Sequence, residues 1–242
     1  MRMLYKDINI DYDYVYRGTK VTNVYLHGWG GDRNIFEWLA NESNLNTLNV
    51  DLPPFGDSGS PKTAWGLDDY VGIILALVDL LGLGKINLIA HSFGGRMSLR
   101  LASKQNIVNK MVLTDIAGVG VRSLWSMLKI FHYKWMKVLA KIGLLDDWFV
   151  GKSGSEDYSR LDDVMKKTFT NIVKINQKHE LKDIDAPCLV VWGDRDKDTS
   201  LRVGKYLAKH LNAKLVVLGG GHYAFLEHKE EYLKIVNEFL GS

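Results

Sequence analysis

Apolar and polar side chains alternate near the start of the chain, which is the pattern of a β-strand with one buried face. The apolar positions of this pattern are Ile8, Ile10, Tyr12, Tyr14 and Tyr16. We therefore predict a β-hairpin or a pair of strands at the N-terminal end.

Downstream, short apolar runs alternate with segments whose apolar residues recur at helical spacing. The runs predicted as strands are residues 21–26, 47–51, 86–90, 110–115, 188–193 and 214–218. The predicted helices are a segment that begins after an N-cap at Asp32, and residues 67–81, 96–104, 201–211 and 230–240. Strands that alternate with helices indicate an α/β fold, with a mostly parallel sheet and helices on both of its faces.

Residues 118–184 break this alternation, because no convincing strand occurs in them. Several of their apolar residues fall on one helical stripe. These are Leu124, Leu128, Phe131, Trp135, Val138 and Ile142. A strand-free insertion of ~65 residues is longer than a normal crossover connection. We therefore predict an α/β core made of residues 1–117 and 185–242, and a helical cap of residues 118–184 that lies over the sheet edge.

Composition narrows the class of protein. The 242 residues suffice for one large α/β domain, and 46% hydrophobic with 24% charged residues is ordinary for a globular protein. The net charge of +3 is weak and dispersed, which argues against nucleic acid as a partner. Cys188 is the single cysteine, so neither an intramolecular disulfide nor a cysteine-based metal site is expected. No segment has the length of a membrane span or the apolar core of a signal peptide, and a cytoplasmic setting is expected.

A serine in a strand-to-helix turn is the strongest chemical signal in the chain. Ser92 stands in the segment Ala-His-Ser-Phe-Gly-Gly of residues 90–95, after one predicted strand and before a predicted helix. Such a turn places the serine in a strained conformation and pushes its hydroxyl out at the carboxyl edge of the sheet. Ala90 departs from the usual Gly-x-Ser-x-Gly pattern, but it is also small.

A serine nucleophile needs a base, and the base needs an acid to orient it. His222 is the best candidate base, because it follows the predicted strand 214–218 and three glycines that allow a close approach. The acid is expected after the preceding strand, where the chain offers Asp194, Asp196 and Asp198. We favour Asp196, since Asp194 is too close to the strand end and Asp198 lies past the turn. Asp115, at the end of an earlier strand, is a second candidate.

The oxyanion of an acyl-transfer intermediate needs donors that are already in place. The backbone N–H of Phe93 lies at the start of the helix behind the serine, and the backbone N–H of Trp29 follows the first parallel strand. His27 is expected to hold that loop by hydrogen bonds. His91 is expected to be structural, because strand alternation points it away from the site. Since no His-Glu-x-x-His pair occurs among the seven histidines, no metal site is expected. A serine nucleophile with a histidine base implies no cofactor.

These features together resemble the α/β-hydrolase superfamily, in its branch of small enzymes with one core and a helical cap. The matching segments are residues 27–30, 51–59, the turn around Ser92, 187–196 and 221–222. In that family the acid of a Gly-x-x-Asp pattern is catalytic, and Gly193 and Asp196 match this pattern. Haloalkane dehalogenases and epoxide hydrolases of this fold have aspartate where this chain has serine, so both are disfavoured.

The prediction is a serine hydrolase of carboxylic esters or related acyl compounds that works through an acyl-enzyme intermediate. Its partner would be a small-molecule acyl substrate, and the sequence does not indicate an oligomeric state. Trp125, Phe131 and Trp135 of the cap are predicted to line a pocket for a small or medium apolar acyl group. Arg122 and the cap lysines are an alternative contact for an anionic substrate.

Two kinds of alternative stay open. The same triad could catalyse acyl transfer, perhydrolysis or carbon–carbon bond hydrolysis. A non-catalytic small-molecule receptor on this fold could also keep the three side chains.

Overall fold

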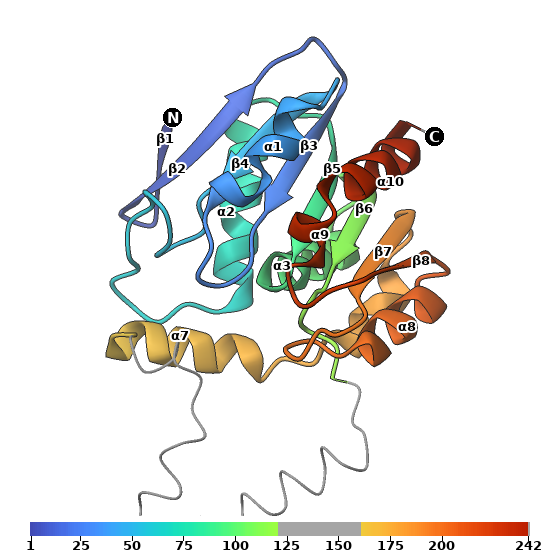
Figure 1. Ribbon diagram of the computed structural model, residues 1–242. Helices are drawn as coiled ribbons and strands as arrows, with labels where there is room; N and C mark the ends of the chain where they lie inside the picture. The colour runs from blue at the N-terminus through green and yellow to red at the C-terminus, as the bar shows by residue number, and fades with distance from the viewer. Residues whose placement is uncertain (121–160, 242) are drawn as a thin grey trace, which may run out of the picture.

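A computed structural model describes residues 1–120 and 161–241 (Figure 1). Its strands are β1 (Arg2–Tyr5), β2 (Ile8–Val15), β3 (Val21–Leu26), β4 (Asn46–Val50), β5 (Lys85–His91), β6 (Val108–Thr114), β7 (Cys188–Gly193) and β8 (Lys214–Leu218). In the described part they form one eight-stranded sheet in the order β1-β2-β4-β3-β5-β6-β7-β8. The pairs β1–β2 and β2–β4 are antiparallel, and every pair from β4–β3 to β7–β8 is parallel. The predicted mostly parallel sheet is therefore confirmed.

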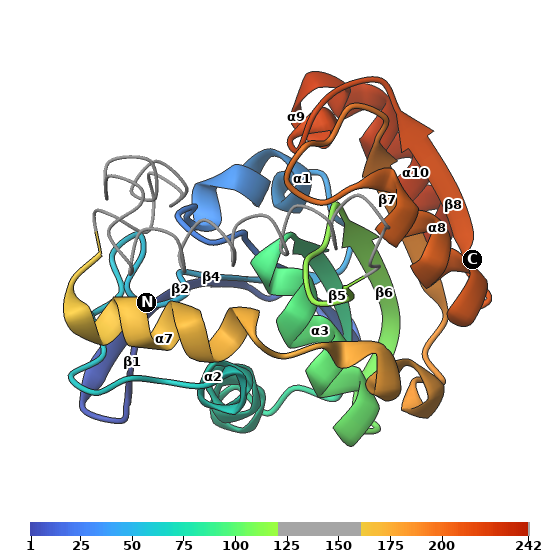
Figure 2. The ribbon, with the colours of Figure 1, turned by 90° about the horizontal axis from the view of Figure 1, so that it is seen from below.

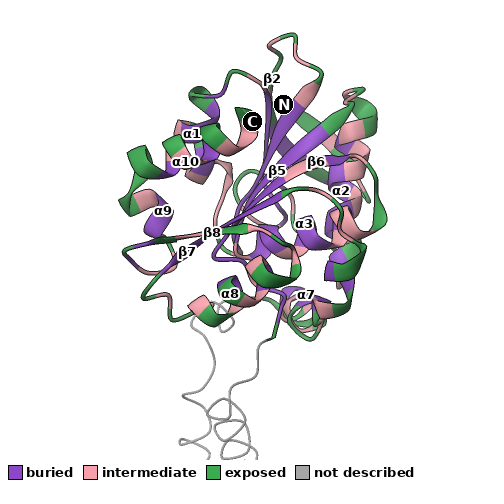
Figure 3. Ribbon diagram, turned by 90° about the vertical axis from the view of Figure 1, so that its right-hand side faces the viewer, coloured by how far each residue is buried: buried purple, intermediate pink, exposed green. Residues whose placement is uncertain are grey.

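Helices cover both faces of this sheet (Figure 2). They are η1 (Arg33–Phe36), α1 (Glu37–Asn41), α2 (Leu67–Leu80), α3 (Phe93–Lys104), α7 (Asp163–Val173), η2 (Gln177–Asp183), α8 (Leu201–His210), α9 (Ala224–Glu227) and α10 (Lys229–Gly241). Alternate residues of each central strand point to opposite faces, which produces two cores. Leu88 of β5 packs in the core under α2, α3 and α8, whereas the next residue, Ile89, packs in the core under α1, α9 and α10. Figure 3 shows the buried strands between helices whose outer sides are exposed.

The predicted elements differ from the observed ones mainly at their ends. The helix expected from residue 96 begins at Phe93, directly after Ser92, because the turn at the serine takes a single residue. The helix expected after Asp32 is a short 3-10 turn followed by α1, with the Asp32 side chain accepting from the N–H of Asn34 as an N-cap.

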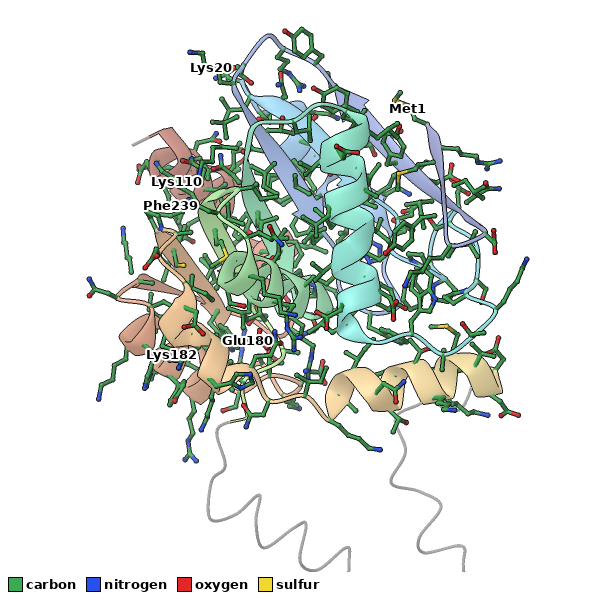
Figure 4. The ribbon with its side chains drawn as sticks, turned by 180° about the vertical axis from the view of Figure 1, so that it is seen from behind. Met1, Lys20, Lys110, Glu180, Lys182 and Phe239 are labelled. Atoms are coloured by element: carbon green, nitrogen blue, oxygen red, sulfur yellow. The ribbon has the colours of Figure 1, made fainter. Side chains whose placement is uncertain are left out.

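Helix α7 crosses below the sheet at the carboxyl ends of the parallel strands (Figure 1). The Trp65 N–H donates to Thr168 Oγ1 at 2.9 Å, which ties α7 to the loop before α2. The following turn, η2, packs against α3, and Glu180 points from it toward that helix (Figure 4). Both elements belong to the segment predicted as a cap. Residues 121–160 lie outside the described part, so the division into core and cap stays a prediction.

Within the described residues, no helix combines the length and apolar character needed to cross a membrane.

Candidate active site

The turn at Ser92 has the predicted strained backbone. Ser92 has φ 49° and ψ −107°, a region that residues with a side chain rarely occupy. Its N–H donates to the carbonyl of Thr114 at 3.1 Å, and its own carbonyl accepts from the N–H of Ala117 at 3.0 Å. These bonds to the end of β6 and to the loop after it hold the turn in place.

Two glycines after the serine allow strand and helix to approach closely. A Cβ on Gly94 would lie 2.1 Å from the carbonyl oxygen of Leu26 in β3. A Cβ on Gly95 would lie 2.2 Å from Cγ2 of Ile116. Both distances are shorter than van der Waals contact, so α3 can begin directly above the sheet only without these side chains.

His222 and Asp196 come from neighbouring loops at the same sheet edge. His222 Nδ1 and Asp196 Oδ2 are 2.8 Å apart, and the Asp196 side chain is fully buried. The two loops are fastened together, since the Gly220 N–H donates to Asp194 Oδ1 and the Arg195 N–H donates to the Gly220 carbonyl, both at 2.8 Å. Asp194 thus holds the histidine loop by its backbone, while Asp196 contacts the imidazole itself.

The surroundings of Asp196 favour its charged form. Burial alone would raise the pKa of Asp196, but hydrogen bonds from His222 and Thr199 outweigh it and lower the pKa to about 2. Thr199 donates from its hydroxyl to Oδ2 at 2.6 Å and from its N–H to Oδ1 at 2.9 Å. Thr199 is not among the residues predicted from the sequence, although aspartate side chains in turns commonly accept from backbone N–H groups shortly after them.

Asp115, the alternative acid, lies beside this pair but has no hydrogen bond to His222 within the described residues. Its Oδ1 accepts from the Gly193 N–H at 2.8 Å, and its Oδ2 is buried without a partner there. Burial raises the pKa of Asp115 to about 8, the Gly193 N–H opposes this rise, and the charge of Asp196 adds to it. Asp115, Asp196 and His222 offer polar atoms within 4.8 Å of one another, as a metal site would. The hydrogen bond between His222 and Asp196 already occupies one atom of each.

His91 contacts the loop that carries His222. Its ring lies 4.6 Å from the ring of His222, and its Nε2–H donates to the His222 carbonyl at 2.8 Å. Burial and the neighbouring His222 lower the pKa of His91 to about 3, so the ring is neutral. The structural role expected for His91 is consistent with this contact. Its closeness to His222 was missed, because strand alternation gives the face of a side chain but not the loop that folds over that face.

His27 has the anchoring role expected of it. Its Nδ1 lies 2.8 Å from the carbonyl oxygen of Gly28, and its Nε2 accepts from the Leu52 N–H at 2.8 Å. The loop that carries Trp29 is therefore fastened to the end of β4.

The N–H groups of Trp29 and Phe93 donate to no other residue in the described part of the chain. The rings of these two residues are 5.3 Å apart in edge-to-face contact, and Phe169 of α7 lies 5.2 Å from Trp29. Phe169 is not among the pocket residues predicted from the sequence, which all come from the segment 124–142. Trp125, Phe131 and Trp135, and also Arg122, lie outside the described residues.

A cavity of about 290 Å³ joins these groups. Its wall includes Gly28, Trp29, Ser92, Phe93, Arg96, Ala117, Phe169, Ile172, Val173, Asp198, Thr199, His222 and Tyr223. Ser92 Oγ makes no hydrogen bond with another described residue, so its hydroxyl is available to a bound molecule. Ser92, His222, Trp29 and Phe93 therefore line one cavity, and Asp196 contacts His222 from outside this lining.

Comparisons with known proteins find similar sequences and structures along most of the chain. The sequence profile of the alpha/beta hydrolase family matches residues 24–235. A pimeloyl-[acyl-carrier protein] methyl ester esterase from Neisseria meningitidis is 26% identical over 91% of this chain and 94% of its own. A 2-hydroxy-6-oxononadienedioate/2-hydroxy-6-oxononatrienedioate hydrolase from Burkholderia vietnamiensis is 28% identical over 88% of this chain and 82% of its own. The solved structure of a hydrolase from Pseudomonas aeruginosa superposes with a TM-score of 0.78 at 18% identity, covering 100% of this chain and 98% of that one.

Proposed function

Because this chain belongs to the alpha/beta hydrolase family, we propose that it is a serine hydrolase of carboxylic esters or related acyl compounds. One observation carries the proposal. Ser92, in a strained turn, and His222, hydrogen-bonded to a buried carboxylate, line the same cavity. That combination can activate a hydroxyl at neutral pH, which an isolated serine cannot do.

In the proposed first step, Ser92 Oγ attacks the carbonyl carbon of the ester while His222 Nε2 takes its proton. The Asp196 carboxylate accepts the Nδ1–H of His222, which leaves Nε2 unprotonated for this task and stabilises the imidazolium that forms. No hydrogen bond joins Ser92 Oγ and His222 Nε2 in the described structure, and we expect this contact to form when substrate binds, since such contacts often tighten only in the complex. The N–H groups of Trp29 and Phe93 stabilise the oxyanion.

To complete the acylation, His222 returns the proton to the leaving alcohol, and the acyl group stays on Ser92. A water molecule then gives a proton to His222 and attacks the acyl carbon. The free acid leaves, and Ser92 regains its proton from His222.

Carbon–carbon bond hydrolysis is the second candidate, and the Burkholderia relative supports it. The same nucleophile, base and oxyanion donors would act, with a carbanion in place of an alkoxide as the leaving group. A non-catalytic receptor would bind acyl compounds without turnover.

Hydrolysis of p-nitrophenyl acetate and butyrate, followed by absorbance, tests the proposal. The Asp196→Asn variant should lower kcat by about 10⁴-fold, because the amide selects the wrong tautomer of His222. Asp115→Asn is the matched control and should cost far less. No turnover by the unaltered protein would contradict ester hydrolysis and leave carbon–carbon bond hydrolysis and the receptor. A greater loss from Asp115→Asn would mean that the acid is the aspartate directly after β6.

A further inference from the structure

One side of the active-site cavity is basic. Arg96 lies in the first turn of α3, four residues after Ser92, and both residues line the cavity. Arg96 lines the cavity with Ser92 and also a second hollow of about 450 Å³ beside it. The apolar part of the lining includes Trp29, Phe93 and Phe169.

The charge of Arg96 has no carboxylate within salt-bridge distance among residues 1–120 and 161–241. Its Nη1 donates to the carbonyls of Ile172 at 3.1 Å and Ile175 at 3.0 Å, at the C-terminal end of α7. Burial lowers the pKa of the Arg96 guanidinium to about 10, and no carboxylate compensates for this loss of hydration. The guanidinium stays protonated at neutral pH.

The next arginine on the same helix shows the difference. Arg100 lies one turn further on and contacts two carboxylates, at 3.1 Å from Asp68 and at 2.8 Å from Glu180. Arg100 does not line the cavity. Of these two arginines, therefore, the one in the cavity lacks an acidic partner in the described structure.

A guanidinium has five N–H donors, and the two carbonyls engage only those on Nη1. The edge formed by Nε and Nη2 has no hydrogen-bond partner in the described chain and suits the two oxygens of a carboxylate. Asp198 lines the same cavity, but it is exposed to water, which screens its charge, whereas Arg96 is mostly covered. Among the described residues that line the cavity, Arg96 is the one side chain with a permanent positive charge.

We propose that Arg96 binds a carboxylate of the substrate, so that the natural substrates are esters that carry a free carboxylate beside an apolar body. This inference rests on the proposed ester hydrolysis. The carboxylate lies either on the acyl side, as in a half-ester of a dicarboxylic acid, or on the alcohol side. The aromatic wall holds the hydrocarbon part while the guanidinium fixes the charged end.

The test compares charged and neutral esters of similar size by titration of the released acid. Monomethyl glutarate against methyl butyrate examines the acyl side, and carboxymethyl butyrate against ethyl butyrate examines the alcohol side. The ratio of kcat/KM for a charged ester to that for its neutral partner should exceed one in at least one pair. In that pair Arg96→Gln should lower the ratio at least tenfold, mainly through KM, and Arg96→Lys should lower it less.

Arg100→Gln is the control for a general disturbance of α3 and should leave the ratio unchanged. A ratio that stays the same in Arg96→Gln, or a preference for the neutral ester in both pairs, would overturn the proposal. Calorimetric titration with glutarate separates this inference from the proposed activity. Glutarate should bind the unaltered protein at least tenfold more tightly than Arg96→Gln, whether or not any ester is hydrolysed, and equal affinities would contradict the carboxylate site.

Discussion

Asp115 and Asp196 are neighbouring acids whose surroundings favour opposite charge states. Asp196 receives hydrogen bonds on both oxygens, and its pKa is lowered to about 2 despite its burial. Asp115 is buried with one oxygen unpartnered within the described chain, and its pKa is raised to about 8. At neutral pH one carboxylate and one carboxylic acid lie side by side. The loop aspartate therefore provides the negative charge that orients His222.

The raised pKa of Asp115 predicts a pH dependence of stability. The folded protein holds this proton more tightly than the unfolded chain, whose aspartates have a pKa near 3.8. The contribution of Asp115 to stability is therefore fully present below about pH 4 and is lost as pH rises through about 8. An asparagine at this position cannot ionise, so the Asp115→Asn variant does not lose stability in this way as pH rises.

Thermal unfolding of the unaltered protein and of Asp115→Asn between pH 5 and 9 measures this effect. The melting temperature of the variant minus that of the unaltered protein should rise with pH up to about 8 and then level off. Asp196 changes stability in the opposite sense and only at acid pH, and it is present in both proteins, so its effect cancels from the difference. A difference in melting temperature that stays constant from pH 5 to 9 would show that Asp115 is already ionised in the folded protein.

At the scale of elements, the position of the site depends on how closely α3 approaches β3. A Cβ at Gly94 would meet the backbone of Leu26, and a strand in the middle of the sheet cannot move aside. The turn at Ser92 therefore requires glycine at position 94 for packing, in addition to the strained backbone at Ser92.

Gly94→Ala should destabilise the protein although alanine is the better helix former. The gain in helix propensity is about 1 kcal/mol, whereas overpacking against fixed backbone costs about 3 kcal/mol or more. Urea unfolding should show a net loss of at least about 2 kcal/mol. Gly241→Ala is the control, because a Cβ there meets nothing within 4 Å in the described structure, and it should be nearly neutral. A Gly94→Ala protein as stable as the unaltered one would mean that α3 is not held this close.

At the scale of the whole molecule, the sequence predicted most of the architecture because buried parallel strands leave plain signals. The strands at 188–193 and 214–218 were predicted to the residue, since each is a short apolar run bounded by polar or turn residues. The serine turn was predicted from local residues alone.

What the sequence could not show are contacts between distant segments. The contact of His91 with His222 joins positions 131 apart. In the sequence, Arg96 is an ordinary polar position of a helix. Its burial depends on the contact with α7, which lies 76 positions further along the chain. The choice among the loop aspartates depended on a turn whose geometry Thr199 fixes, which a pattern of residue types does not specify.

Covalent labelling with a fluorophosphonate tests the central claim most directly, because the reagent reacts with an activated serine and mimics the acylation step. Mass spectrometry of the labelled and digested protein should show one adduct, on the peptide that contains Ser92. Ser92→Ala should abolish the adduct while its circular dichroism stays that of a folded protein. Ser103→Ala, on the helix α3 that follows Ser92, should label normally. An adduct that persists in folded Ser92→Ala, or that maps to another residue, would contradict the proposal that Ser92 is the nucleophile.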